Sequence, residues 1–320
     1  MLYNIMNVLS LFDGIACARV ALQYANIEVN KYYSCEIDKY AMNISKKNYP
    51  SIISLGSVID FKKEMIKEEI DLLIGGSPCQ DLSIAKKDRK GLDGDRSSLF
   101  FGYVRIMKEM NPKYFILENV ASMKAEDRDI ITGLMGVEPV MFNASLVSAQ
   151  NRKRYFWTNI KFDLPIDRGI LLKDILEYDA EIDERFMGKN GKALCLLSNY
   201  YKRTPTENEI KRCIAGRNVN YVKSNKIGHI GKTDAQANRV YSIEGKSVCL
   251  SSNGGGLGAK TGLYKIDNDL IRKLTPIECE RLQSLPNNYT EGVSNTQRYK
   301  CLGNAFNCEV IAHILKSINL

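Results

Sequence analysis

The chain has 320 residues, of which 44% are apolar and 26% charged, and this composition is typical of a globular protein with a large core. No run of about 20 uncharged apolar residues is present, and the apolar N-terminus meets Asp13 without a basic leader, so we expect a soluble, cytoplasmic protein without a membrane partner. Nine scattered cysteines without a Cys-x-x-Cys pair, and two isolated histidines, argue against a disulfide framework and against a bound metal.

The net charge of +8 is unevenly distributed along the chain. Residues 185–265 contain 15 Lys and Arg against 4 Asp and Glu, a balance of +11, which leaves −3 for all other residues. A basic excess confined to one segment suits a surface that binds a polyanion such as nucleic acid. A solvated lysine-rich surface is the alternative that charge alone leaves open.

Short apolar runs alternate with amphipathic segments over residues 7–160, which predicts a mainly parallel sheet covered by helices. Between the third and fourth runs, apolar residues from Leu99 to Met107 recur at helical spacing before Pro112, and we interpret this stripe as core. The expected strands are residues 8–12, 31–35, 71–74, 114–117, 140–146 and 154–158.

The regular pattern stops at residues 181–266, which are rich in Gly, Asn, Ser and Lys. This stretch has too few apolar residues for a sheet of its own size and predicts a small, loop-rich domain. Helices are expected again at 274–285, beginning near Thr275-Pro276, and at 303–318. We therefore expect one domain from residues 1–180 and 267–320, interrupted by a second domain at 181–266.

A cysteine follows the third predicted strand, in the sequence Gly75-Gly76-Ser77-Pro78-Cys79-Gln80. Parallel strands place chemistry at their carboxyl ends, the glycine pair permits close approach of a ligand, and proline restricts the turn. Cys79 is therefore a candidate nucleophile, although a small buried thiol beside a turn is the alternative.

Several further segments belong to the same predicted sheet edge. Phe12-Asp13-Gly14-Ile15 follows the first strand, and Glu36 ends the second about 20 residues later, a pairing that favours an adenosine-bearing cofactor over an ordinary turn. Glu118, in Glu118-Asn119-Val120, should emerge beside Cys79 as a general acid or a reader of a base edge, unless it serves as a helix N-terminal partner. Gln150-Asn151-Arg152-Lys153-Arg154 offers two cations there, or is an exposed basic turn.

Taken in order, Phe-x-Gly, Pro-Cys-Gln, Glu-Asn-Val, Gln-x-Arg-x-Arg and Gly303-Asn304-Ala305 resemble the DNA cytosine-5 methyltransferases over nearly the whole chain. Residues 74–105 and 147–157 look most like the animal de novo enzymes and small bacterial or phage relatives. The resemblance implies a Rossmann-like methyltransferase domain and a target-recognition domain. It implies catalytic roles for Cys79, Glu118, Arg152 and Arg154.

S-adenosyl-L-methionine is the cofactor that the resemblance implies. Two positions depart from the family pattern, because Ala16 stands where many members have a second Gly and Ser57 where an Asp usually meets the adenine amino group. The implied cofactor residues are Phe12, Asp13, Gly14, Ile15, Glu36, Ile37, Ser57, Val58, Pro78, Asn304 and Ala305.

The resemblance also implies a chemical role for each catalytic group. The thiolate of Cys79 adds to carbon 6 of cytosine, and Glu118 stabilises the ring if burial raises its carboxyl pKa. Arg152 or Arg154 supplies positive charge and grips the base. The target must leave the stacked duplex, because carbon 5 is inaccessible inside it.

Double-stranded DNA is the implied partner. The resemblance also implies a bacterial or phage enzyme, which either belongs to a restriction-modification system with a cognate restriction endonuclease or is an orphan enzyme without one. The expected DNA-contacting residues are Gln80, Ser83, Lys86, Lys87, Arg89, Arg217, Arg239, Lys260 and Thr261. An RNA cytosine-5 methyltransferase is one alternative, since a branch of the family acts on transfer RNA, and a catalytically silent DNA-binding regulator is another. An NAD-linked oxidoreductase lacks support from hydride-site residues.

Overall fold

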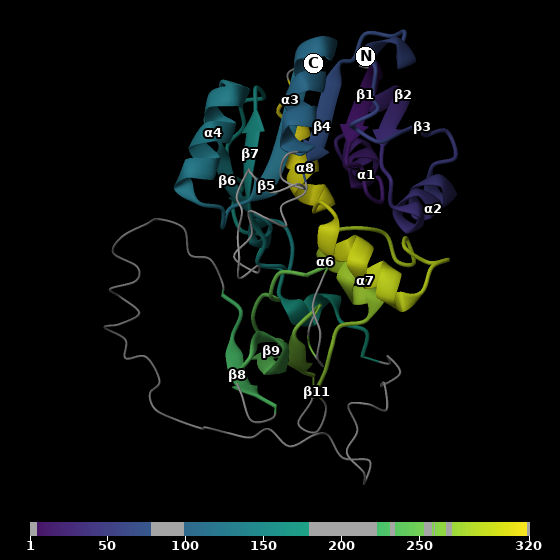
Figure 1. Ribbon diagram of the computed structural model, residues 1–320. Helices are drawn as coiled ribbons and strands as arrows, with labels where there is room; N and C mark the ends of the chain where they lie inside the picture. Colours follow the sequence, from purple (N-terminus) through teal and green to yellow (C-terminus); the bar gives the residue numbers. More distant parts are fainter. Residues whose placement is uncertain are drawn as a thin grey trace.

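A seven-stranded sheet with the order β3-β2-β1-β4-β5-β7-β6 forms the centre of the larger part of this computed structural model (Figure 1). The structure describes residues 5–77, 99–178, 223–230, 234–252, 258, 260–266 and 271–318. The strands are β1 (Ile5–Leu11), β2 (Glu28–Cys35), β3 (Ile53–Gly56), β4 (Leu72–Gly76), β5 (Tyr114–Val120), β6 (Val140–Asn143) and β7 (Lys153–Thr158). The pairings of β7 with β5 and with β6 are antiparallel and the other four pairings of this sheet are parallel, which confirms the expected α/β fold with a mainly parallel sheet.

Helices cover both faces of this sheet. Apolar side chains of α3 and α4 join the core on one face, and those of α1, α2 and α8 join the core on the other. The α-helices are α1 (Cys17–Tyr24), α2 (Lys39–Asn48), α3 (Leu99–Met110), α4 (Ala125–Met135), α6 (Pro276–Leu282), α7 (Asn295–Asn304) and α8 (Cys308–Leu315). The 3₁₀ helices are η1 (Lys63–Met65), η3 (Ala144–Leu146), η4 (Leu172–Ile175) and η6 (Gln236–Asn238).

Side chains at helix starts explain where several helices begin. The Thr275 hydroxyl accepts a hydrogen bond from the Glu278 N–H, and the Glu278 carboxylate accepts one from the Thr275 N–H, which is a capping box. Asp38 caps α2 by accepting from the Tyr40 N–H at 2.9 Å. The predicted start near Thr275-Pro276 is therefore confirmed.

The C-terminal region differs from the sequence prediction, because residues 303–318 do not form one helix. Helix α7 ends at Asn304, the chain is extended at Ala305, and α8 begins at Cys308. The break has a side-chain cause: Asn307 accepts a hydrogen bond from the Val310 N–H and starts α8 anew. The result is a turn, residues 303–307, at the edge of the sheet.

A second sheet, with the order β11-β10-β9-β8, occupies the green region below the first (Figure 1). Its strands are β8 (Lys226–His229), β9 (Arg239–Ser242), β10 (Leu263–Lys265) and β11 (Ile271–Arg272). The expectation that this stretch cannot support a sheet was therefore wrong. Strands of two to four residues need little apolar area, and Ile230, Val240, Leu263 and Ile271 alone form their buried cluster.

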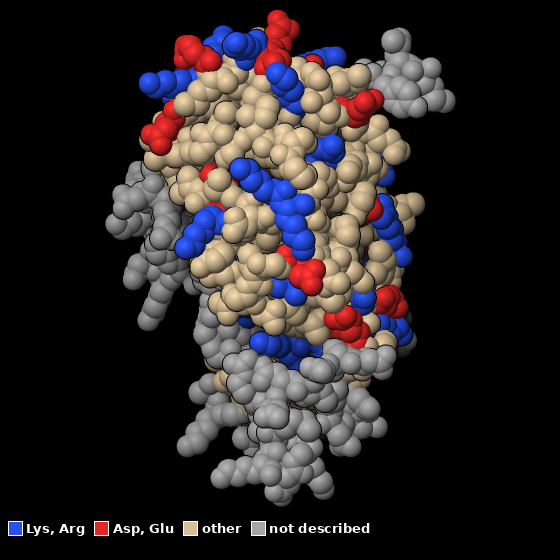
Figure 2. Space-filling model, turned by 90° about the vertical axis from the view of Figure 1, so that its right-hand side faces the viewer, with Lys and Arg blue, Asp and Glu red and all other residues tan. Residues whose placement is uncertain are grey.

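Charges on the face beyond β3 and α2 are mixed in sign. Lysine and arginine side chains lie there among acidic ones, with wide uncharged areas between them (Figure 2). Two ion pairs illustrate the mixing: Lys300 with Asp38 at 2.6 Å and Lys47 with Glu291 at 3.4 Å. Among the helices that the structure describes, none has the length and apolar character that crossing a bilayer requires.

Candidate active site

The carboxyl ends of β4 and β5 bring the chain that leads to Cys79 beside Glu118. Gly76 lies directly opposite Glu118 in the sheet, and a Cβ on Gly76 would lie only 3.0 Å from Glu118 Oε2. A side chain at this position would force the Glu118 carboxylate and the Phe306 ring, whose Cε1 would be 2.8 Å away, to move. The Asn119 amide then donates to the Ser77 hydroxyl at 3.0 Å, which fixes the first residue after β4.

Asn119 is a positioning residue that the sequence analysis did not identify, although it stands next to Glu118 in the motif. Cys79 and Pro78 themselves lie outside the described residues. The structure therefore fixes the path of the chain up to Ser77, two residues before the candidate nucleophile.

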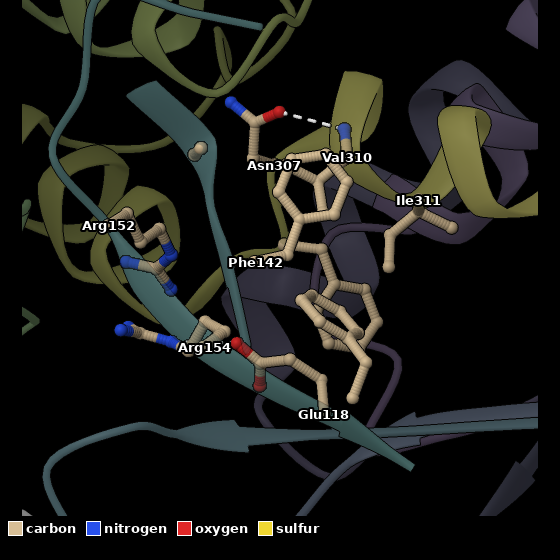
Figure 3. Close-up of a pocket in the computed structure, with 10 residues that line it drawn as sticks. Glu118, Phe142, Arg152, Arg154, Asn307, Val310 and Ile311 are labelled. Carbon is tan, nitrogen blue, oxygen red and sulfur yellow. Dashed lines mark hydrogen bonds and ion pairs between the residues drawn. The ribbon is translucent and has the colours of Figure 1, made fainter. Parts of the chain in front are cut away.

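Glu118 and Arg154 form an ion pair at this edge, with Arg154 Nε 2.7 Å from Glu118 Oε1. Residue 156 of β7 pairs with Glu118, so Arg154 lies two positions along on the same sheet face and reaches the carboxylate. Both side chains are largely buried, with 14% and 12% exposure. Figure 3 shows the Glu118 carboxylate directed toward the Arg154 guanidinium.

Arg152 makes different contacts from Arg154. Its buried guanidinium donates from Nη2 to the Ala305 carbonyl at 2.7 Å and to the Gly303 carbonyl at 3.4 Å. Arg152 thus holds the turn between α7 and α8. Of the two predicted arginines, only Arg154 pairs with the carboxylate.

Cys249 lies between these arginines and had no role in the sequence analysis. Its sulfur is 3.4 Å from Arg152 Nη1 and 3.9 Å from Arg154 Nη2. Burial raises the pKa of this thiol, but the charges of the two guanidiniums outweigh that effect and lower the pKa below its ordinary value. No sequence spacing could have indicated the contact, because 97 residues separate Cys249 from Arg152.

A small hollow, with room for about one water molecule, lies beside these groups (Figure 3). Its polar end is formed by Glu118, Arg152 and Arg154, and its other walls are mostly apolar. Those walls are formed by Phe142, Ala144, Phe156, Phe306, Asn307, Val310 and Ile311. The arrangement gathers one carboxylate and two guanidiniums at the polar end of this hollow.

The turn after β1 is tied to the turn after β2 through Glu36. One oxygen of Glu36 accepts from the Gly14 N–H at 2.8 Å, and the other accepts from the N–H groups of Ile37 and Asp38, both at 2.7 Å. Ile37 is 75% exposed beside it. An exposed apolar side chain next to a carboxylate suits the adenosine part of a cofactor.

The remaining predicted cofactor residues lie around these turns. Phe12 has a left-handed backbone at φ 55°, and so does Ala16 at φ 60°, the position where the family usually has glycine. Ser57 accepts from the Ile59 N–H at 3.1 Å, Val58 is buried, and Ile15 accepts at its carbonyl from Tyr289. In the turn before α8, Asn304 is exposed and Ala305 is buried.

Asp13 is a buried carboxylic acid in the turn after β1. The Tyr32 hydroxyl donates to Asp13 Oδ1 at 2.7 Å, whereas Oδ2 has no hydrogen-bond partner. Burial raises the pKa of Asp13 from the ordinary 3.8 to about 6, more than the Tyr32 hydrogen bond lowers it. In the folded protein the neutral acid therefore predominates below about pH 6 and the carboxylate above it.

The stability of the protein should depend on pH through the titration of Asp13. Because its folded pKa is raised, its contribution to stability is fully present below about pH 4 and is lost as pH rises through about 6. Asn does not titrate. Between pH 4.5 and 7.5 the free energy of unfolding of the parent should therefore fall by about 2 kcal/mol relative to that of Asp13→Asn. Urea denaturation at both pH values measures this difference, and parallel curves for the two proteins would contradict the assignment.

The expected DNA-contacting residues have diverse environments. Arg239 pairs with Asp234 at 3.2 Å, and Lys260 donates to the Thr296 carbonyl at 3.4 Å. Thr261 is buried and its hydroxyl bonds to the Gly262 carbonyl, so the expectation that Thr261 faces DNA was wrong. The other six lie outside the described residues: Gln80, Ser83, Lys86, Lys87, Arg89 and Arg217.

Comparisons with known proteins identify the family and the fold. A family model described as C-5 cytosine-specific DNA methylase matches residues 6–320. The type II methyltransferase M.HhaI of Haemophilus parahaemolyticus is 29% identical, over 98% of this chain and 94% of that protein. The orphan methyltransferase M.Rho11sI of Bacillus phage rho11s is 28% identical over 83% of this chain, which spans 61% of that protein. The crystal structure of S. pombe Dnmt2 methyltransferase has a TM-score of 0.64 and 17% identity, covering 98% of this chain and 100% of that one, and shares the fold.

Proposed function

Because the chain belongs to the C-5 cytosine-specific DNA methylase family, we propose that it methylates carbon 5 of a cytosine flipped out of duplex DNA, through a covalent adduct with Cys79. The observation that carries this proposal is the pairing of Gly76 with Glu118, and the hydrogen bond from Asn119 to Ser77. Cys79 follows Ser77 by two residues. A cysteine that leaves the sheet at this point can reach the same ligand as Glu118.

S-adenosyl-L-methionine would supply the sulfonium methyl group in this reaction. The residues present fit its adenosine part, because exposed Ile37 offers an apolar platform and Glu36 Oε2, which accepts one hydrogen bond, retains a lone pair beside it. Phe12, Gly14 and the Asn304-Ala305 turn complete the proposed site. The Ser57 hydroxyl accepts from the Ile59 N–H in a turn and carries no negative charge, so we expect a weaker contact with the adenine amino group than an Asp would make.

In the proposed reaction Cys79, Glu118 and Arg154 each have a distinct role. The Cys79 thiolate attacks carbon 6, and negative charge moves onto the ring toward nitrogen 3. Glu118 shares a proton at that nitrogen, and Arg154, 2.7 Å from Glu118 Oε1, keeps the carboxyl oriented. Once carbon 5 has bonded to the methyl group, a base takes the carbon 5 proton, the electron pair of that C–H bond re-forms the double bond between carbons 5 and 6, and Cys79 leaves carbon 6 as a thiolate.

Recognition of DNA is proposed for residues 181–266, with residues 1–180 and 267–320 forming the catalytic domain. The basic balance of +11 over residues 185–265 supports this division. Gln80, Ser83, Lys86, Lys87 and Arg89 would close over the duplex, while Arg217, Arg239 and Lys260 approach a groove or the phosphates. The biological setting we propose is the cytoplasm of a bacterium, in a restriction-modification system or as an orphan or phage enzyme.

Covalent trapping tests the proposal directly. DNA in which cytosine is replaced by 5-fluorocytosine should give an adduct that survives denaturing electrophoresis when S-adenosyl-L-methionine is present, because the fluorine cannot leave as a proton does. Cys79→Ser should give none. Label transferred from the cofactor to transfer RNA and not to DNA would overturn the choice of substrate, and an adduct with Cys79→Ser would overturn the choice of nucleophile.

A further inference from the structure

Residues 246–252, which we call the strap, pass across the candidate active site. At its start, the fully buried Lys246 ammonium group donates to three acceptors in the catalytic part of the chain. The Ser247 N–H then donates to the Ala149 carbonyl at 2.7 Å, and the Ser247 carbonyl accepts from the Asn151 N–H at 3.0 Å. The strap is thus hydrogen-bonded to the segment that carries the two arginines.

Cys249 is the strap residue that contacts both arginines. Beyond that contact, each guanidinium holds a different part of the site: Arg154 pairs with Glu118, and Arg152 donates to the Ala305 carbonyl. One sulfur atom therefore joins the carboxylate side of the site to the turn before α8.

The far end of the strap packs on that turn. A Cβ on Gly303 would lie 2.3 Å from the Ser252 nitrogen and 2.4 Å from the Ser251 carbonyl carbon, so the two backbones are in direct contact. The strap is held at both ends, and Cys249 lies between them. Its side chain has little freedom to leave the arginines.

We propose that Cys249 is a positioning residue for methyl transfer, an inference that rests on the proposed function. Its sulfur accepts hydrogen bonds from both guanidiniums and thereby keeps Arg154 against Glu118 and Arg152 against the Gly303–Ala305 turn. Cys249 does not touch the base in this scheme. It acts through the arginines, and it gives the basic segment a direct contact with the catalytic groups.

The chemistry of sulfur suits this role. The Cys249 thiol donates to the Leu250 carbonyl at 3.4 Å, so the lone pairs of its sulfur remain to accept from the two guanidiniums, whose charges lower the pKa of the thiol. A large acceptor with a long bond to carbon can also meet two donors at once. A thiol that only fills space would be replaceable by any small side chain.

Three variants separate positioning from packing. Cys249→Ala removes the acceptor, Cys249→Ser keeps a smaller acceptor, and Cys279→Ala removes a fully buried thiol of α6 as a control for packing alone. Unmethylated bacterial genomic DNA serves as substrate because it contains the target whatever its sequence. The measurements are the single-turnover rate with labelled S-adenosyl-L-methionine, the KM for that cofactor and the thermal unfolding midpoint.

The single-turnover rate of Cys249→Ala should fall about tenfold or more, and Cys249→Ser should recover at least about a third of the parent rate. The KM should stay within about twofold of the parent value, and the midpoint should fall no more than in Cys279→Ala. Equal rates for Cys249→Ala and the parent would overturn the proposal. The proposal would also be overturned if Cys249→Ser were as slow as Cys249→Ala and both variants had unfolding midpoints lowered in proportion to their loss of rate.

Alkylation reports the contact without any activity. Iodoacetamide labelling of Cys249 at pH 7, followed by mass spectrometry of its peptide, should slow about threefold or more in Arg154→Gln, because one cation near the sulfur is lost. Unchanged labelling would contradict the contact. Failure of the proposed function looks different: the parent itself transfers no methyl group to DNA, while the labelling result is unaffected.

Discussion

Glu118→Gln should lower the single-turnover rate of methyl transfer at least about 100-fold while leaving the fold intact. Glutamine has nearly the same shape, and its carbonyl oxygen can still accept from Arg154 Nε, which lies 2.7 Å from the native carboxylate. It cannot take up or share a proton with ring nitrogen 3. The loss should therefore fall on the chemical step.

The matched control for this variant is Glu109→Gln. Glu109 is also paired with an arginine, Arg105 at 3.1 Å, but lies on α3 with 36% of its side chain exposed. Its substitution should leave the rate within about twofold, since exposed ion pairs contribute little. Rapid quench of reactions with labelled S-adenosyl-L-methionine measures both rates. A Glu118→Gln rate within about threefold of the parent would remove Glu118 from the mechanism.

The placement of Glu118 illustrates what the sequence could predict. Apolar runs over residues 71–74 and 114–117 predict buried parallel strands, and parallel strands end at one edge, so Glu118 was expected beside the Cys79 turn. The register of β4 with β5 places Glu118 opposite Gly76, three residues before Cys79. Strand β3 escaped prediction because it is a short edge strand with two exposed residues and no apolar run.

Other contacts depend on folding that no local pattern encodes. Arg152 or Arg154 was expected to grip the base, and no local pattern indicated that Arg152 also donates to the carbonyls of residues 303 and 305, about 150 positions along the chain. Cys249 meets the arginines only because Ser247 pairs with the segment before them. The small sheet likewise depends on pairings between strands too short to show a period.

Gly303→Ala should have the largest effect on stability among the changes considered, lowering the free energy of unfolding by about 3 kcal/mol. The added methyl group would lie 2.3 Å from the Ser252 nitrogen and 2.7 Å from the Ser251 oxygen. Both are backbone atoms, so no side-chain rotation relieves the clash. The strap must move away from the turn, which should also reduce methyl transfer by the molecules that still fold.

Gly133→Ala is the control that shows the effect of replacing a glycine where the added methyl group meets no clash. Gly133 lies inside α4, where an added Cβ meets nothing within 4 Å, so alanine should raise the free energy of unfolding by about 0.5 to 1 kcal/mol through its helix propensity. Denaturant titrations of the two variants should therefore shift in opposite directions from the parent. A Gly303→Ala protein as stable as the parent would mean that the strap does not pack on this turn. Because Arg152 donates to the carbonyls on both sides of Asn304, the same result would also weaken the assignment of that turn to the site.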